Sequence, residues 1–288
     1  MDYKNYHEPV LLNQLMAHFQ LRENAIVFDG TMGFAGHAEA ILQSFPNTQY
    51  VGFDKDIDAI KIAKGRCASF KNVSIVNAPF SSMFNYMTRE NVMPTHILLD
   101  LGVSSFQIDQ SNRGFTFQKN EPLDMRMDHY SKVSAKEILD TYNEDDLIAL
   151  FETEGDIKHP NKLVAEILSR RQHNELNTTF DLVECVKRGV FVNSRRQFIA
   201  MCTKVFQAIR IEVNGEMEEL RQCLDRLLEM NDVVVAIITF QPNEDKLVKS
   251  FIKEHQLNRI NKKPIQASYH ECKKNPRERT AKLRIFQI

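Results

Sequence analysis

Short apolar runs alternate with helical patterns along the first hundred residues, and no other feature of the chain constrains its fold as strongly. Apolar runs at 25–29, 49–54, 73–76 and 96–100 have the length of strands, and an amphipathic segment begins near Asp56. Strands that alternate with helices build a mainly parallel sheet covered by helices on both faces. The unbroken apolar run at 96–100 suits burial on both faces. The sequence therefore predicts a doubly wound α/β fold.

The alternation stops after Asp100. Residues 120–193 have helical spacing with polar joints and no convincing strand, so we expect an inserted helical lobe. Strand character returns at 233–240, and a last short strand is expected at 281–286. The predicted domains are a sheet domain made of 1–115 and 205–288 and a helical insertion at 116–204.

Composition favours a soluble, globular chain, with 43% hydrophobic and 26% charged residues among 288. No run approaches the roughly 18 apolar residues of a membrane span, and residues 1–4 lack the layout of a signal peptide. We therefore expect a cytoplasmic protein that does not enter a membrane. The five cysteines are scattered, which predicts reduced thiols, and no ligand spacing indicates a metal site.

Positive charge gathers near the end of the chain. Residues 246–288 hold 12 Lys and Arg against 3 Asp and Glu, although the whole chain has a formal net charge of -1. Such an asymmetry supplies phosphate contacts to a nucleic acid or, equally well, forms a solvated basic face.

Glycines follow the first predicted strand. In residues 29–37, Gly33 and Gly36 allow the backbone to approach a bound nucleotide, and Asp29 stands at the strand end. Alone, this turn fits a purely structural connection just as well.

The second predicted strand ends in Asp54, where a carboxylate accepts two hydrogen bonds from a ribose diol. An adenosine is thereby indicated, and a nicotinamide dehydrogenase would fit this half of the chain equally well. Against a dehydrogenase stand the missing third glycine of its motif and the lack of a clear acid or base for hydride transfer.

Polar and aromatic motifs follow the fourth strand at 100–107, 113–117 and 122–128. Since the mouth of a doubly wound sheet lies at the carboxyl ends of its strands, these side chains should line it. Two readings stay open for Arg113 and Arg126, phosphate contact or ion pairs with nearby acids. The phenylalanines of this segment either stack on a base or anchor the core.

Five motifs stand in order: HEPVLL at 7–12, GxxGH at 33–37, DLGVSS at 100–105, RGF at 113–115 and PLDMRMD at 122–128. In this combination the chain resembles the RsmH (MraW) family of small-subunit ribosomal RNA methyltransferases. The resemblance implies a Rossmann-like class I methyltransferase sheet with an inserted all-helical lobe that recognises RNA. It also implies S-adenosyl-L-methionine as cofactor and the N4 amine of a cytidine as acceptor, in ribosomal RNA within the small subunit. A homodimer is left open.

The resemblance and the motifs together give the expected site. The catalytic candidates are Asp100 and Ser104. The cofactor-binding candidates are Asp29, Gly33, Ala35, Gly36, His37, Asp54, Phe80, Asp100 and Gln107. The substrate-binding candidates are Arg113, Phe115, Phe117, Arg126, Lys204 and Arg210. Ala35 stands where the family usually has glycine, and alanine is tolerable there only if φ is negative.

The chain departs from the family pattern in a late loop at 241–246, where a usual histidine is absent and Pro242 has entered. These departures lie in the half expected to face RNA. They support an alternative in which the protein is a non-catalytic or retargeted cofactor-binding factor for ribosome assembly.

Overall fold

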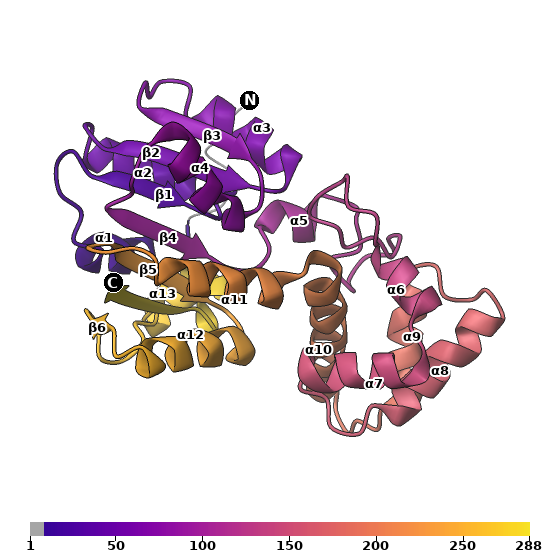
Figure 1. The fold of residues 1–288 in the computed structure, drawn as a ribbon. Coiled ribbons are helices and arrows are strands. Elements are labelled where there is room, and N and C mark those ends of the chain that lie inside the picture. The colour runs from indigo at the N-terminus through magenta and orange to yellow at the C-terminus, as the bar shows by residue number, and fades with distance from the viewer. Residues whose placement is uncertain (1–8) are drawn as a thin grey trace. The chain divides into compact units, whose positions relative to one another are not determined.

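The computed structural model describes residues 9–288, so His7 and Glu8 of the first motif lie outside the described residues. The chain forms two compact units (Figure 1). The sheet unit comprises Met1–Gly102 and Met217–Ile288, and the helical unit comprises Val103–Glu216. The sequence placed these junctions at 115 and 204. The helical unit therefore includes more of the chain on both sides, namely residues 103–115 and 205–216.

The sheet unit is built on seven strands in the order β3-β2-β1-β4-β5-β7-β6. Neighbours are parallel from β3 to β5, whereas β7 runs antiparallel to both β5 and β6. The strands are β1 (Ile26–Asp29), β2 (Gln49–Asp54), β3 (Val73–Asn77), β4 (His96–Asp100), β5 (Val234–Thr239), β6 (Asn258–Arg259) and β7 (Lys282–Gln287). The predicted Rossmann-like α/β sheet is confirmed.

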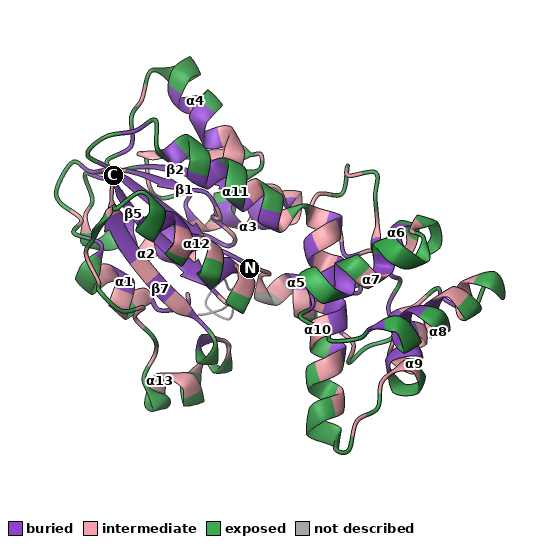
Figure 2. Ribbon diagram, turned by 60° about the horizontal axis from the view of Figure 1, so that its bottom comes forward, coloured by how far each residue is buried: buried purple, intermediate pink, exposed green. Residues whose placement is uncertain are grey.

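Apolar side chains alternate between the two faces of this sheet, as period-two strands require. Phe28 of β1 joins a core beneath α4, α11 and α12, whereas Val27 joins the core beneath α1, α2 and α3. The interior strand β5 is buried along its whole length (Figure 2). The helices are α1 (Leu12–His18), α2 (Gly36–Ser44), α3 (Ile57–Arg66), α4 (Met83–Glu90), α11 (Glu216–Leu227), α12 (Pro242–Glu254) and α13 (Tyr269–Lys274), with 3-10 turns at Phe80–Ser82 and Pro276–Arg279.

The segment expected as a late loop is the start of a helix. Pro242 is the first residue of α12, a position where its fixed φ and missing N–H cost nothing. Gln241 and Glu244 form a capping box there, and Glu244 also accepts from the N–H of Phe240 at 2.8 Å. The departure from the family pattern is thus compatible with regular local structure.

The helical unit has its own apolar core. Its helices are α5 (Ser105–Asp109), α6 (Ala135–Thr141), α7 (Glu144–Thr153), α8 (Asn161–Gln172), α9 (Thr179–Gly189) and α10 (Arg195–Asn214). Short polar motifs define where these helices begin: Ser134 with Glu137 caps α6, and Asn143 with Asp146 caps α7. Within 9–288, no helix is both long and apolar enough to cross a membrane.

Candidate active site

Asp29, the last residue of β1, stabilises the turn between β1 and α2 through hydrogen bonds. This carboxylate is buried and accepts hydrogen bonds from the N–H of Thr31 at 3.0 Å and from the hydroxyl of Tyr50 at 2.6 Å. Burial raises the pKa of Asp29 to about 6, and the hydrogen bonds from Tyr50 and Thr31 oppose that rise. Asp29 therefore shapes the turn.

Asp54 joins the same turn to the end of β2. Its Oδ2 accepts from the N–H of Gly33 and its Oδ1 from the N–H of Asp56, each at 2.8 Å. Burial raises the pKa of Asp54 to about 6. An ionised carboxylate has about four acceptor positions, so Asp54 retains capacity for ribose hydroxyls.

Two glycines are explained by what packs against them. A Cβ on Gly36 would lie 2.9 Å from Cγ of Pro9, so Pro9 packs directly against the turn. A Cβ on Gly30 would lie 2.6 Å from Cβ of Phe80, which is itself buried. Larger residues at either position would push the turn away from its support.

Ala35 does not meet the condition of a negative φ under which alanine would be tolerable here. Its φ is 61°, in the left-handed region, at the N-cap of α2, and its side chain is fully buried. The helix begins at the next residue, so the chain must turn sharply here, and glycine would do so without strain. Ala35 thus holds a left-handed backbone conformation at an energetic cost.

Asp100 ends β4, and its carboxylate combines burial with an oxygen that has no hydrogen-bond partner among the described residues. Its N–H donates to Oγ1 of Thr31 at 2.5 Å, which fixes the backbone. Its Oδ1 is buried and has no hydrogen-bond partner among the described residues. Burial, followed by the nearby charges of Asp29 and Glu244, raises the pKa of Asp100 well above its ordinary value.

His37 lies beside this carboxylate. Its Nδ1 is 3.8 Å from Oδ2 of Asp100, and its Nε2 is 3.0 Å from the carbonyl oxygen of Val10, to which it donates. The ring is buried. His37 therefore anchors the segment after Pro9 to the turn.

These groups have more acceptors than donors. Asp54 has spare lone pairs, and Oδ1 of Asp100 lacks a partner among the described residues. Such a set fits a ligand that brings hydroxyl groups and an ammonium group. The nucleoside and amino-acid ends of S-adenosylmethionine carry both.

Ser104 and Gln107, both in the helical unit, cap α5. The N–H of Ser104 donates to Oε1 of Gln107 at 2.8 Å, and the N–H of Gln107 donates to Oγ of Ser104 at 3.3 Å. The serine hydroxyl is thus used as an N-cap acceptor. Gln107 is buried, and its side chain participates in this reciprocal cap.

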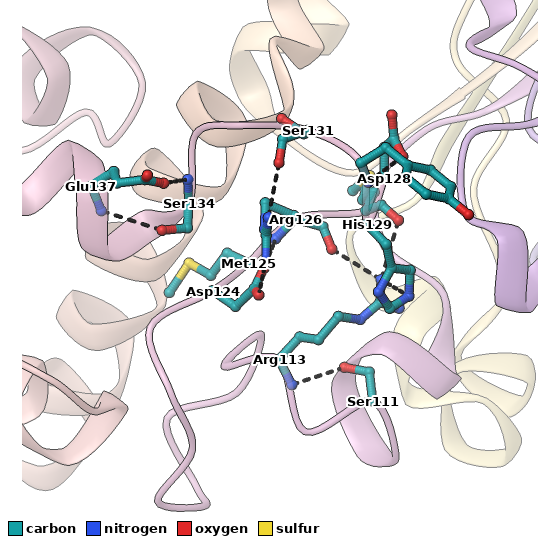
Figure 3. A network of polar contacts seen from close by, with 12 residues as sticks. Ser111, Arg113, Asp124, Met125, Arg126, Asp128, His129, Ser131, Ser134 and Glu137 are labelled. Carbon is teal, nitrogen blue, oxygen red and sulfur yellow. Dashed lines mark hydrogen bonds and ion pairs between the residues drawn. The ribbon is translucent and has the colours of Figure 1, made fainter.

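The two candidate arginines organise the PLDMRMD segment (Figure 3). Arg126 donates two hydrogen bonds to the carboxylate of Asp124, from Nε to Oδ1 at 2.9 Å and from Nη2 to Oδ2 at 2.7 Å. Arg113 is buried and donates to the carbonyl oxygens of Arg126 and Met127, at 3.0 and 3.1 Å. Arg126 thus forms one of the ion pairs that the sequence left open, with Asp124, whereas Arg113 donates to carbonyl oxygens of the same segment.

The remaining substrate candidates also have internal contacts. Phe115 and Phe117 pack against the core of the helical unit, and Phe117 meets Phe206 edge-on with ring centroids 5.6 Å apart. Lys204 pairs with Asp156 at 3.0 Å, and Arg210 pairs with Glu216 through two contacts of 2.8 and 3.0 Å. Of these ion pairs, only that of Lys204 is exposed.

Several residues of the site were not predicted. Thr31 lies within the glycine turn and binds both Asp29 and Asp100, so its position was itself the available signal. Tyr50 and Glu244 act from other elements, the first through its hydroxyl and the second through its charge. No local motif identifies these two.

Comparison with known proteins assigns the chain to a family. Residues 4–288 match the model of the MraW methylase family. Ribosomal RNA small subunit methyltransferase H of Nitratiruptor sp. is 39% identical, with 98% of each chain covered. The proteins of the same name from Nautilia profundicola and Thermotoga neapolitana are 37% and 36% identical, with 98% and 99% of this chain and 97% of each relative covered. The chain belongs to the MraW methylase family.

Proposed function

We propose that this methyltransferase moves the methyl group of S-adenosylmethionine to the exocyclic N4 amine of a cytidine in small-subunit ribosomal RNA. Relatives that cover nearly the whole chain are named ribosomal RNA small subunit methyltransferase H. The observation that carries the proposal is Asp100, whose Oδ1 is buried and unpaired among the described residues at the carboxyl end of β4. In doubly wound sheets this end of the strands is where ligands bind.

The cofactor-binding residues would be those of the glycine turn and the neighbouring strand ends. Asp54 would accept hydrogen bonds from the ribose hydroxyls, and Asp100 would accept from the ammonium of the methionine end. Gly33 and Gly36 would allow the backbone of the turn to lie close to the cofactor. Phe80 packs under the turn, near the adenine. When bound, S-adenosylmethionine supplies an electrophilic methyl group on a sulfonium centre.

Asp100 also suits the acceptor base. The lone pair of cytosine N4 is conjugated with the ring, so a hydrogen-bond acceptor for its N–H strengthens the nucleophile in the transition state. A carboxyl whose pKa is raised accepts a proton more readily than an ordinary carboxylate. Its two oxygens allow Asp100 to receive one donor from the cofactor and one from the base.

The non-catalytic alternative rested on the segment 241–246. That segment is an intact helix start in which Pro242 and the capping box of Gln241 are locally favourable. It gives no reason to expect lost catalysis, and family membership favours the methyltransferase.

The first experiment is the transfer of labelled methyl groups from S-adenosylmethionine to small ribosomal subunits that lack their native methylations. Free small-subunit RNA serves as a parallel substrate, and nucleosides are then identified by mass. We expect labelled N4-methylcytidine, with subunits preferred over free RNA. Label in another nucleoside would overturn the N4 assignment. Cofactor binding without any methyl transfer would favour the alternative of a non-catalytic assembly factor. Sedimentation of the active species tests whether the protein is a homodimer.

A further inference from the structure

An aromatic ring and two arginines are exposed where α9 gives way to α10. Phe191 is 90% exposed, the highest value among the exposed large hydrophobic residues. Arg195 and Arg196 begin α10 and are also exposed. Within the described part of the chain, neither arginine takes part in an ion pair. Figure 2 shows the N-terminal end of α10 largely in green.

Core packing and hydrogen bonds fix the backbone on both sides of Phe191. Val190 and Phe198 pack against the core of the helical unit. The N–H of Asn193 donates to Oε1 of Gln197 at 2.8 Å, and the N–H of Gln197 donates to Oγ of Ser194 at 3.2 Å. The ring therefore projects from a loop whose two ends are anchored, so little ordering is needed before it contacts a partner.

This part of the chain contains no acidic residue. From 185 to 211 there is no Asp or Glu, while six basic residues occur: Lys187, Arg188, Arg195, Arg196, Lys204 and Arg210. Four of the six are paired with acids from outside the segment, at 3.2 Å for Lys187 with Glu184 and 3.7 Å for Arg188 with Glu166, and as described above for the other two. Arg195 and Arg196 are left to face an anionic partner.

We propose that residues 190–200 form a contact site for single-stranded RNA, in which an unpaired base stacks on Phe191 and Arg195 and Arg196 bind the adjacent phosphates. The proposal rests on the function proposed above, because the ribosomal RNA is the strand it would hold. Aromatic rings beside unpaired cations are how proteins hold single strands without reading sequence. Tyr130, which is 83% exposed, lacks this context, since the N–H of Tyr130 binds the carboxylate of Asp128.

The chain has no tryptophan, which permits a direct test. Phe191→Trp places a single indole in the proposed site of the full-length protein, and Tyr130→Trp is the matched exposed control. Each variant is titrated with oligocytidine RNA while tryptophan fluorescence is followed. We expect stacking to quench the indole at 191 and to leave the indole at 130 unchanged.

Affinity and salt dependence provide the second measurement. Phe191→Ala should weaken oligocytidine binding roughly 5- to 100-fold, and Phe191→Tyr should restore it, because stacking on one ring is worth that much. Replacing both Arg195 and Arg196 by alanine should lower the slope of log affinity against log salt by about 1.4, since each single-strand phosphate contact contributes about 0.7. Arg221→Ala, at an arginine of the sheet unit paired with Glu218, should leave the slope unchanged.

The outcomes separate this inference from the proposed function. Methyl transfer by Phe191→Trp with no quenching overturns the RNA contact alone. Quenching without methyl transfer by the unmodified chain supports the contact and overturns the proposed reaction. Quenching that depends on protein concentration in the absence of RNA would show that Phe191 meets a second copy of the chain, and would also overturn the proposal.

Discussion

Oδ2 of Asp100 faces Nδ1 of His37 across 3.8 Å, while Oδ1 of the same carboxylate is buried and unpaired among the described residues. An unpaired buried acceptor destabilises a folded protein unless a ligand satisfies it. We therefore expect Asp100→Asn to lower methyl transfer by roughly 100- to 10,000-fold, the range typical of losing a positioned proton acceptor. The same change should raise the stability of the ligand-free chain by about 1–2 kcal/mol, because one of three neighbouring carboxyl groups loses its charge.

Methyl transfer and thermal unfolding of the ligand-free protein test both halves of this prediction. Asp245→Asn is the matched control. Asp245 is paired with Lys282 at 3.0 Å and Arg284 at 2.8 Å, and its pKa is lowered by Arg284 and Lys282, against the opposing effect of burial. That variant should be less stable. An Asp100→Asn protein that is destabilised to the same extent would show that the charge of Asp100 does not destabilise the ligand-free fold.

Asp29 predicts a distinct pH dependence of stability. Its pKa is about 6 in the folded chain, against about 3.9 for an unfolded aspartate. Between these values the folded state binds more protons than the unfolded state, so stability falls as pH rises from 4 to 6 and the penalty persists above pH 6. Asp29→Asn removes this penalty and should be more stable than the unmodified chain at pH 7.5 by about 1–3 kcal/mol.

The measurement is the free energy of unfolding by urea at pH 4.5 and pH 7.5 for both proteins. The variant should gain more stability over the unmodified chain at pH 7.5 than at pH 4.5, because most of the penalty develops between these values. Part of the pH dependence should survive, because Asp54 has the same raised pKa. Equal differences at both pH values would mean that Asp29 titrates as an ordinary carboxylate.

The sheet and the turn were predictable because their signals are local. Period-two and unbroken apolar runs define β1, β2 and β4, and the turn must follow the first of these strands. The place of Asp54 at the end of β2 was predictable because strand ends are fixed in this topology. For the same reason Asp100 was recognised at the end of β4.

What the sequence did not predict depends on residues far apart in the chain or on a single dihedral angle. Tyr50 reaches Asp29 through strand pairing, and the side-chain amide of Asn214 donates to the carbonyl of Met125 across 89 residues. Arg113 and Arg126 bind groups of their own unit, although their charge alone fitted phosphate equally well. The φ of Ala35 is positive although alanine disfavours that region, and no sequence pattern indicated it.

Ala35→Gly should stabilise the protein. Alanine in the left-handed region costs about 1–2 kcal/mol, and glycine avoids this while adding a smaller entropy to the unfolded chain. We expect a net gain of about 0.5–1 kcal/mol, measured as a higher unfolding temperature. Ala38→Gly, the same change at a buried position inside α2, should lower that temperature. A loss of stability at both positions would show that the strain at Ala35 is absent.

Arg210 and Lys204 should respond differently to alanine. The pair of Arg210 with Glu216 is largely buried, with 13% of each side chain exposed, so Arg210→Ala leaves a carboxylate without its partner and should cost about 1–3 kcal/mol. Lys204→Ala breaks an exposed pair and should leave stability unchanged. If Lys204 contacts RNA, its loss should instead reduce the salt slope of RNA binding by about 0.7. Unfolding and RNA titration of both variants measure the difference. A salt slope that Lys204→Ala does not alter would exclude Lys204 from the RNA contact.

Ser104 tests whether a residue predicted to be catalytic serves only as a cap. Ser104→Ala removes the acceptor for the N–H of Gln107 and should destabilise α5 by about 1 kcal/mol, with part of the methyl transfer lost as Gln107 moves. Ser104→Asn supplies another good N-cap acceptor and should retain most of the activity.

A hydroxyl that takes part in the reaction cannot be replaced by an amide. Equal loss of methyl transfer in both variants, with α5 still protected from hydrogen exchange in the asparagine variant, would therefore restore Ser104 to the catalytic set. Because the N–H of Ser104 also donates to the Gln107 side chain at 2.8 Å, Gln107→Ala should match Ser104→Ala if the cap is what matters.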